Sequence, residues 1–149
     1  MKKLPAACGF ALCLLLSIST LALARADDGP TKINFDDIKL KLEKGQTFRK
    51  SMLTKKAKSY DGKTISIRGY MIPSFKADGI TDFVLMRNTQ CKFGSDAAHH
   101  FIHIRMTAGQ SASYTLRPIT IVGDFKIKQF KVGKKTWAIY EINDGSLKK

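Results

Sequence analysis

The three histidines of the chain, His99, His100 and His103, fall within five residues of one another and follow Cys91 closely. A thiolate and imidazoles together form a ligand set that suits zinc or copper. We therefore treat these four residues as candidate ligands of a transition metal. The alternative is that the histidines are structural or surface side chains and that Cys91 is a buried apolar residue, the commonest role of such a cysteine.

The spacing of these residues decides which of them could share one ion. On a helix, His99 and His103 would lie one turn apart on the same face. On a strand they would share a face but lie about 13 Å apart, too far for one ion. A shared site would then need Cys91 with His99 and His100, or His103 with residues of another strand.

A second set of residues could hold a polyanion. The predicted strands carry basic and aromatic side chains opposite or beside the aliphatic ones, and small barrels use such side chains to hold phosphates and stack bases. The alternative is a sheet with one solvated face, on which Lys and Arg keep the protein soluble. The candidate polyanion-binding residues are Arg68, Tyr70, Arg105, Lys126 and Lys128.

The sequence contains no motif of a known catalytic site. It has no glycine-rich phosphate loop, no G-x-S-x-G and no H-E-x-x-H. Asp36 and Asp37 stand at an expected helix start, where acids serve as caps. A thiolate–imidazole pair at Cys91 would need a histidine close to it in space. We predict a protein that is not an enzyme and assign no catalytic residue.

Residues 1–26 have the composition of a cleavable secretory leader. Lys2 and Lys3 precede an apolar stretch, and Ala24-Arg25-Ala26 is a small-x-small cleavage site. The alternative is a membrane anchor, but the apolar run is shorter than the roughly 20 residues that span a bilayer. We expect a mature chain of residues 27–149 that is periplasmic or secreted, with no transmembrane span and no cysteine besides Cys91.

The charge balance bears on the partners of this protein. The chain has 26 basic and 12 acidic residues, a net charge of +14, which becomes +11 once Lys2, Lys3 and Arg25 leave with the leader. Such a charge attracts anionic lipid head groups or anionic polymers of the cell envelope, while an exported protein meets little nucleic acid. Envelope proteins bound at a sheet edge are a further possibility.

Residues 27–62 are predicted to form a lead-in with a short amphipathic helix over 46–58. Asn34 or Asp36 could cap a turn of helix near its start. Residues 63–145 form the predicted β domain and 146–149 a basic tail. Alternating apolar residues predict five strands, at 64–72, 81–87, 100–106, 118–127 and 137–142, with a hairpin turn at 131–135.

These elements predict a mainly β fold with a minor helical part. Five strands with short turns favour an antiparallel sheet. Gly69 and Gly123 fall mid-strand, as at the bends of a small closed barrel. We predict a five-stranded antiparallel OB-like barrel with an N-terminal helix, and the alternative is an open sheet covered by the helix over 46–58. This fold does not select a function.

Three segments in order carry a resemblance to a known family. These are Gly69-Tyr70-Met71-Ile72-Pro73, then Ile80-Thr81-Asp82-Phe83-Val84-Leu85-Met86, then Cys91-Lys92-Phe93-Gly94. Over roughly residues 62–127 the chain resembles exported bacterial proteins of the DUF3299 type. That family brings no established activity. Its members often carry further cysteines or a cysteine–histidine arrangement near the position of Cys91, whereas here the histidines stand further along.

Overall fold

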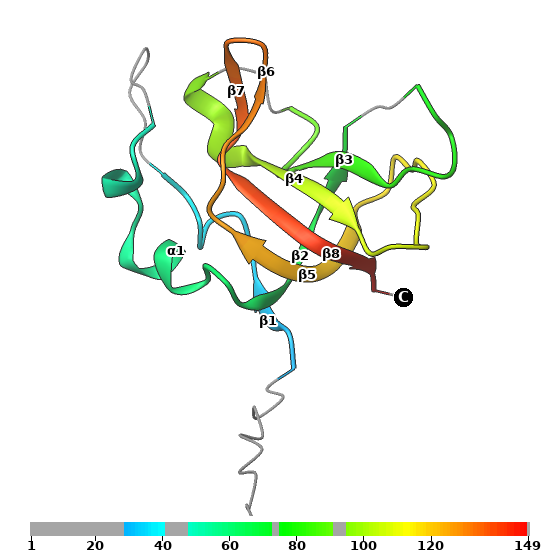
Figure 1. The fold of residues 1–149 in the computed structure, drawn as a ribbon, viewed down its shortest axis with the longest axis horizontal. Coiled ribbons are helices and arrows are strands. Elements are labelled where there is room, and N and C mark those ends of the chain that lie inside the picture. The colour runs from blue at the N-terminus through cyan, green and yellow to red at the C-terminus, as the bar shows by residue number, and fades with distance from the viewer. Residues whose placement is uncertain (1–28, 41–47, 73–74, 91–94, 149) are drawn as a thin grey trace, which may run out of the picture.

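The computed structural model describes residues 29–40, 48–72, 75–90 and 95–148, apart from the side chains of 95–97. The predicted leader and Cys91 therefore lie outside the described residues. Within the described part, no helix is long and apolar enough to cross a membrane. The elements (Figure 1; η marks a 3-10 helix) are β1 (Thr31–Ile33), η1 (Lys50–Met52), α1 (Lys55–Ser59), β2 (Thr64–Met71), β3 (Asp82–Met86), η2 (Ser95–His100), β4 (Phe101–Met106), β5 (Ile119–Lys126), β6 (Phe130–Val132), β7 (Lys135–Ala138) and β8 (Tyr140–Leu147).

The fold is mainly β, as predicted, and its main sheet has six strands. The strand order is β1-β2-β3-β4-β8-β5, and β2 also pairs with β5. Neighbour-to-neighbour pairing therefore leads from β2 through β3, β4, β8 and β5 back to β2. The prediction of a wholly antiparallel sheet is wrong, because β4 pairs with β8 and β1 with β2 in parallel. The strand β8 lies between β4, with which it is parallel, and β5, with which it is antiparallel. The alternation of apolar residues along a strand does not indicate which strands pair with it.

The helix predicted over 46–58 is not one helix in its described part. It consists of η1 and the five-residue α1, with an extended backbone at Leu53 and Thr54 between them. The Thr54 hydroxyl accepts a hydrogen bond from the Ala57 N–H at 3.0 Å, so Thr54 starts α1. Leu53 and Ala57 are buried in the main core. Phe48 and Met52 are partly buried and also pack against this core, so the segment predicted as an amphipathic helix does turn its apolar side chains inward.

The predicted alternation is confirmed along the strands that carry the core. Ile65, Ile67 and Met71 of β2 are buried, as are Ile121 and Phe125 of β5. A Cβ atom at Gly123 would lie 2.6 Å from Ile142 Cγ2, so only glycine lets β5 approach β8 there. The pairing of β5 with β8 shifts register between Val122 and Asp124. The bend predicted at Gly123 is thus an irregularity in the pairing of these two strands.

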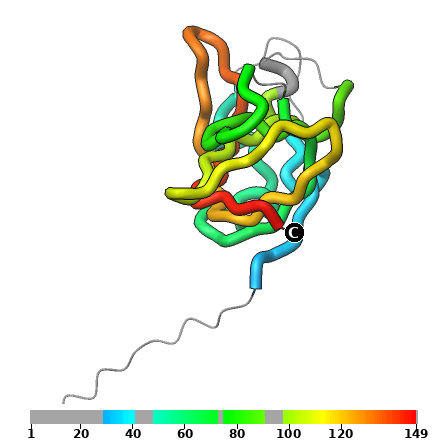
Figure 2. The backbone as a smooth tube through the Cα atoms, turned by 90° about the vertical axis from the view of Figure 1, so that its right-hand side faces the viewer, coloured from blue at the N-terminus to red at the C-terminus, as the bar shows by residue number. Residues whose placement is uncertain are grey.

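A hairpin of β6 and β7 interrupts the connection from β5 to β8 and projects at one edge of the molecule (Figures 1 and 2). It splits the strand predicted over 137–142, because β7 ends at Ala138 and β8 begins at Tyr140. Ala138 packs with Met86 and Phe101 into a second apolar cluster, against which Phe130 is also packed. This cluster lies on the far side of β3 and β4 from the main core.

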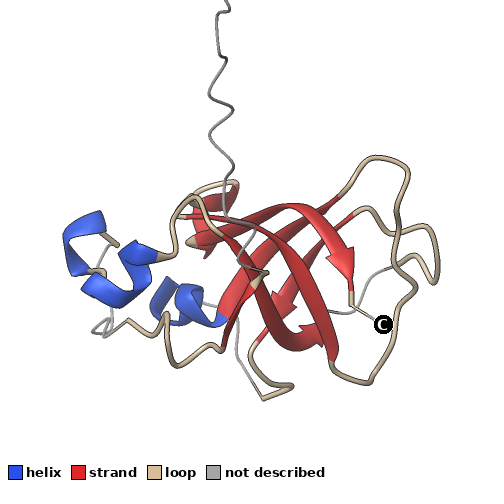
Figure 3. Ribbon diagram, turned by 90° about the horizontal axis from the view of Figure 1, so that it is seen from below, coloured by secondary structure: helices blue, strands red, loops and turns tan. Residues whose placement is uncertain are grey.

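Helical segments and long loops gather at opposite ends of the strands, as Figure 3 shows. The lead-in before η1 closes the core at the helical end. The Asn34 side chain accepts hydrogen bonds from the N–H groups of Asp36 and Asp37. It therefore caps a turn, and the short helix predicted after it is not formed. The buried Tyr140 hydroxyl donates to the Ile38 carbonyl at 2.7 Å. Burial raises the pKa of this hydroxyl, which keeps it a donor.

Candidate functional site

His103 of β4 lies between two carboxylates on the outer side of the sheet. Its Nε2 is 2.8 Å from Asp82 Oδ1 on β3, and its Nδ1 is 3.3 Å from Glu141 Oε2 on β8. The side chain is only 1 % exposed. A neutral imidazole has one N–H and can donate to one carboxylate, whereas the protonated ring donates to both. The two ring nitrogens of His103 therefore link β4 to both neighbouring strands, β3 and β8, through side-chain contacts.

Glu141 is the centre of a larger charge cluster. The Lys128 ammonium lies 3.0 Å from Oε1, and Arg105 NH2 lies 3.9 Å from Oε2. Burial acts to raise the pKa of Glu141. Hydrogen bonds from Lys128, His103 and Asn143 and the charge of Arg105 outweigh that effect and hold the pKa below its ordinary value of 4.5. The buried carboxylate is therefore ionised at neutral pH and its charge is compensated.

The β6–β7 hairpin closes this cluster from above. The ring of Phe130 stacks on that of His103 with centroids 4.0 Å apart and an angle of 11° between the planes. Lys128, on the chain that leads into the hairpin, forms its ion pair with Glu141. The two contacts fix the hairpin to β4 and β8. They also leave His103 without access for a substrate, which makes it a structural rather than a reacting group.

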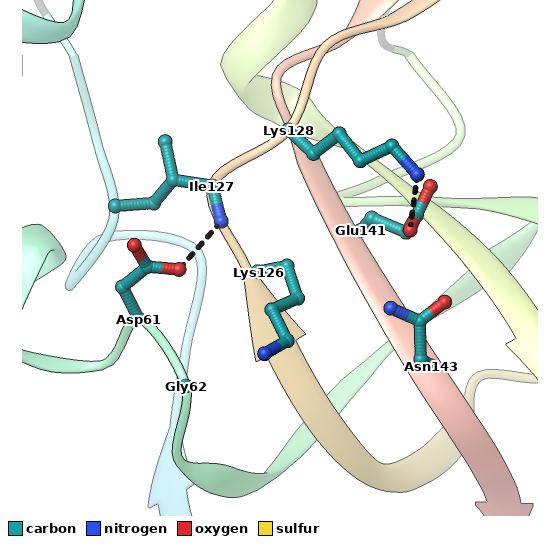
Figure 4. Close-up of a pocket in the computed structure, with 7 residues that line it drawn as sticks. All are labelled: Asp61, Gly62, Lys126, Ile127, Lys128, Glu141 and Asn143. Atoms are coloured by element: carbon teal, nitrogen blue, oxygen red, sulfur yellow. Dashed lines mark hydrogen bonds and ion pairs between the residues drawn. The ribbon is translucent and has the colours of Figure 1, made fainter.

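An open pocket of about 510 Å³ borders the cluster where β5 ends and β2 begins (Figure 4). Its acids already have partners. Asp61 Oδ1 accepts from the Ile127 N–H at 2.9 Å, and Glu141 is held by Lys128. The Lys126 ammonium forms neither an ion pair nor a hydrogen bond with any residue that the structure describes. The lining residues are Asp61, Gly62, Lys126, Ile127, Lys128, Glu141 and Asn143.

The structure gathers three of the five candidate polyanion-binding residues and places the other two elsewhere. Arg105, Lys126 and Lys128 lie around Glu141, since Lys126 is also its register partner across β5 and β8. Tyr70 packs against the second apolar cluster. Arg68 is exposed on β2 opposite Thr120, toward the other end of β5. A single surface of all five side chains is therefore not present.

The candidate metal ligands are also divided. His103 belongs to the charge cluster, whereas His99 contacts His100 with ring centroids 4.1 Å apart. His99 is buried, and its Nδ1 has no hydrogen-bond partner among the described residues. Burial, followed by the charges of His100, Lys39 and Arg87, lowers the pKa of His99 to about 4. Residues 29–40, 48–72, 75–90 and 95–148 contain no group of three or more His, Cys, Asp or Glu side chains placed to hold an ion.

Burial and nearby charge act on His100 in the same direction. Burial and the charges of Arg87 and Lys39 lower the pKa of His100, against the opposing effect of Asp36. The pair is therefore neutral at physiological pH, the state in which imidazole ligates metals.

Sequence reasoning missed Asp82 and Glu141, the acids that organise the cluster. Glu141 did carry a signal, because it is the lone charged residue in the run Trp-Ala-Ile-Tyr-Glu-Ile at 137–142. A charge in such a run is buried only with a partner. The partner, His103, stands 38 residues earlier and is reached through the parallel pairing of β4 with β8.

No protein-family model and no curated protein sequence matches the chain. The fold is similar to the crystal structure of a DUF3299 family protein from Pseudomonas aeruginosa, with a TM-score of 0.50 and 12 % sequence identity over 81 % of this chain and 97 % of that one. The sequence resemblance to the DUF3299 type is therefore confirmed at the level of the fold, which this chain shares with that family's protein.

Proposed function

We propose that this protein is an exported, non-enzymatic binding protein of the cell envelope, periplasmic or secreted, and that it binds an anionic ligand in the pocket at Lys126. The ligand class is a phosphate-bearing polymer or lipid head group. In this proposal the five strands β2, β3, β4, β8 and β5 form an OB-like barrel. The return of their pairings to β2 and the mid-strand glycines support that closure.

The Lys126 ammonium carries this proposal. It lies in a pocket of about 510 Å³ beside a second lysine, and no described residue neutralises it. The neighbouring Glu141 does not compete for it, because Lys128, His103 and Arg105 already compensate that carboxylate. An unpaired cation beside the compensated Glu141 favours an anion, and hydrogen bonds to charged groups are the stronger ones.

The β6–β7 hairpin covers the surface that barrels of this type commonly use for ligands, which favours the pocket at the end of β5. OB-type barrels commonly bind ligands on the outer faces of the strands that correspond to β3 and β4. Here Phe130 and Ala138 of the hairpin pack against Met86 and Phe101 on that side. A ligand therefore finds more open surface at the end of β5 than over β3 and β4.

A matched pair of variants tests the proposal. Lys126→Gln and Lys55→Gln each remove one exposed positive charge, so they change the long-range field of the protein alike. Binding of fluorescent inorganic polyphosphate and of short-chain, water-soluble phosphatidylglycerol would be measured for both variants. We expect Lys126→Gln to weaken binding about tenfold and Lys55→Gln to change it little. The probe that binds more tightly separates the polymer from the head group. Equal losses in both variants would refute the pocket as the site.

A second candidate function is the binding of zinc or copper, and the unpartnered Nδ1 of the buried His99 favours it. The sequence predicts four candidate ligands, Cys91, His99, His100 and His103. The site proposed here uses the first three, because both ring nitrogens of His103 face carboxylates of the charge cluster. The protein would be purified without chelators under reducing conditions, and its metal content measured. Near-stoichiometric zinc or copper that is lost in Cys91→Ser and in His100→Gln supports the candidate. Unchanged metal affinity after replacement of all three ligands rules it out.

A further inference from the structure

Two loops at one end of the strands expose large apolar side chains. Phe75, in the connection from β2 to β3, is fully exposed, and Leu116, in the connection from β4 to β5, is 81 % exposed. Single exposed apolar residues are common on protein surfaces and need no explanation. Two of the largest at the same end of a small domain raise the question of whether they act together.

Backbone hydrogen bonds join the two loops into one unit. The N–H groups of Ile80 and Ala112 donate to each other's carbonyl oxygens, at 3.0 and 2.9 Å, and the Tyr114 N–H donates to the Ala77 carbonyl at 2.7 Å. Ile80 and Ala112 are themselves buried in the main core. Figure 2 looks onto this end and shows both loops crossing the front of the molecule. The two apolar side chains therefore project from a single supported surface.

Positive charge surrounds this surface. Lys76 follows Phe75 and Arg117 follows Leu116 in the sequence, and both are exposed. Arg68 is the register partner of Thr120, and the Lys148 N–H donates to the Thr120 carbonyl at 2.9 Å. Arg68 and Lys148 thus flank the start of β5, three residues beyond Arg117. Asp82, at the start of β3, is also exposed but faces Arg105. The other four cations outnumber the two remaining exposed acids, Asp78 and Asp144.

We propose that this loop end docks on an anionic phospholipid surface. Phe75 and Leu116 enter the head-group region, where aromatic side chains are favoured, and Arg68, Arg117 and Lys148 contact the lipid phosphates. Each cation near such a surface contributes about 1 kcal/mol, or about fivefold in binding. Apolar contact and charge together give the two signals that stable membrane attachment needs.

The combination favours a lipid surface over a protein partner. Exposed apolar side chains with exposed cations near them match the apolar interior and the charged head groups of an anionic bilayer. This inference is independent of the Lys126 pocket, which lies at the opposite end of β2 and β5. A docked molecule would therefore present that pocket away from the membrane.

Vesicle binding tests the proposal. The full chain would be expressed with its own leader and recovered after processing, so that all variants share one N-terminus. Sedimentation with vesicles of phosphatidylcholine and phosphatidylglycerol would be compared with sedimentation with phosphatidylcholine alone. We expect binding only to the anionic vesicles, a loss of about tenfold or more in Phe75→Ser/Leu116→Ser, a loss of about fivefold in Arg117→Gln, and weaker binding as salt rises.

The chain offers a matched control in Val132. Val132 is half exposed at the tip of the hairpin, next to Lys131. Val132→Ser therefore also removes an exposed apolar side chain beside a lysine, but away from the two loops. We expect this variant to bind like wild type. In Phe75→Trp the fluorescence emission should shift to the blue with anionic vesicles, and in Val132→Trp it should not. Absence of binding, equal loss in the Val132 variant, or dimerisation through Phe75 and Leu116 without vesicle binding would overturn the proposal.

Discussion

The ring of Phe130 lies flat against that of His103, with centroids 4.0 Å apart, although one residue belongs to the β6–β7 hairpin and the other to β4. This contact covers a buried polar side chain with an apolar one. It also joins the hairpin to the two strands whose parallel pairing brings His103 to Glu141. The hairpin is thus part of the fold rather than an appendage to it.

Truncation of Phe130 should destabilise the protein. Phe130→Ala removes the stacked ring and exposes the charge cluster to water, so we expect the free energy of unfolding to fall by about 2 kcal/mol. Urea denaturation measures this change. Val132→Ala, on the same strand but half exposed, serves as control and should change stability by less than about 0.5 kcal/mol. Similar values for the two variants would show that the stack contributes nothing of its own.

The Glu141 cluster should make stability depend on acid pH. The pKa of Glu141 is lower in the folded protein than its ordinary value of 4.5. The ionised carboxylate therefore stabilises the fold fully above about pH 4.5, and this stabilisation is lost as the pH falls through the folded pKa. Glu141→Gln should be less stable than wild type at neutral pH, and the difference should shrink below pH 4.5.

Urea denaturation of wild type and Glu141→Gln between pH 7 and pH 3 measures this difference. A second acid with a lowered pKa, Asp37, is present in both proteins, so its effect cancels in the comparison. A difference between the two proteins that stays constant across this range would contradict the ionic role of Glu141.

Gly123 should tolerate no side chain. A Cβ atom there would lie 2.6 Å from Ile142 Cγ2 and 2.7 Å from the Asn143 carbonyl oxygen, and the second contact is with backbone. We expect Gly123→Ala to lower the free energy of unfolding by about 2–3 kcal/mol. Gly29→Ala, which would meet no atom within 4 Å, is the control. Thermal melting of both proteins distinguishes a steric effect from a general effect of replacing glycine.

The leader prediction has its own test. When the full chain is produced in a bacterium, we expect export and cleavage after Ala26, which gives a protein that begins at Asp27. Mass spectrometry of the recovered protein reads the new N-terminus directly. Ala26→Glu should block cleavage, because the site requires a small residue at that position. An intact chain retained in the cytoplasm would contradict the predicted export.

Alternation of apolar residues located the strands of the core because the side-chain period reports directly on which face is buried. The pattern at Ile65 and Ile67 is of this kind, and both residues are buried. The partners of each strand are not encoded in that way. The parallel pairing of β4 with β8 depends on where the chain returns after the hairpin, so the meeting of His103 with Glu141 could not be predicted.

The candidate site was predictable only in part for the same reason. Lys126 and Lys128 were identified from their charge and from their place opposite or beside the aliphatic residues of a predicted strand. The sequence could not show how the two lysines differ. The Lys128 ammonium is paired with Glu141, whereas the Lys126 ammonium is not paired with any described residue. The basic and aromatic pattern also included Tyr70, whose side chain instead packs against the cluster beneath the hairpin.

Binding of an anionic ligand in the pocket at Lys126 can be followed residue by residue in an NMR titration. Labelled protein would be titrated with inorganic polyphosphate at low salt, and its amide signals followed. We expect the largest shifts at Gly62, Ile127 and Asn143, which line the pocket, and we expect these shifts to vanish in Lys126→Gln. Shifts concentrated on the lysines of α1, or no saturable shifts at all, would contradict binding in this pocket.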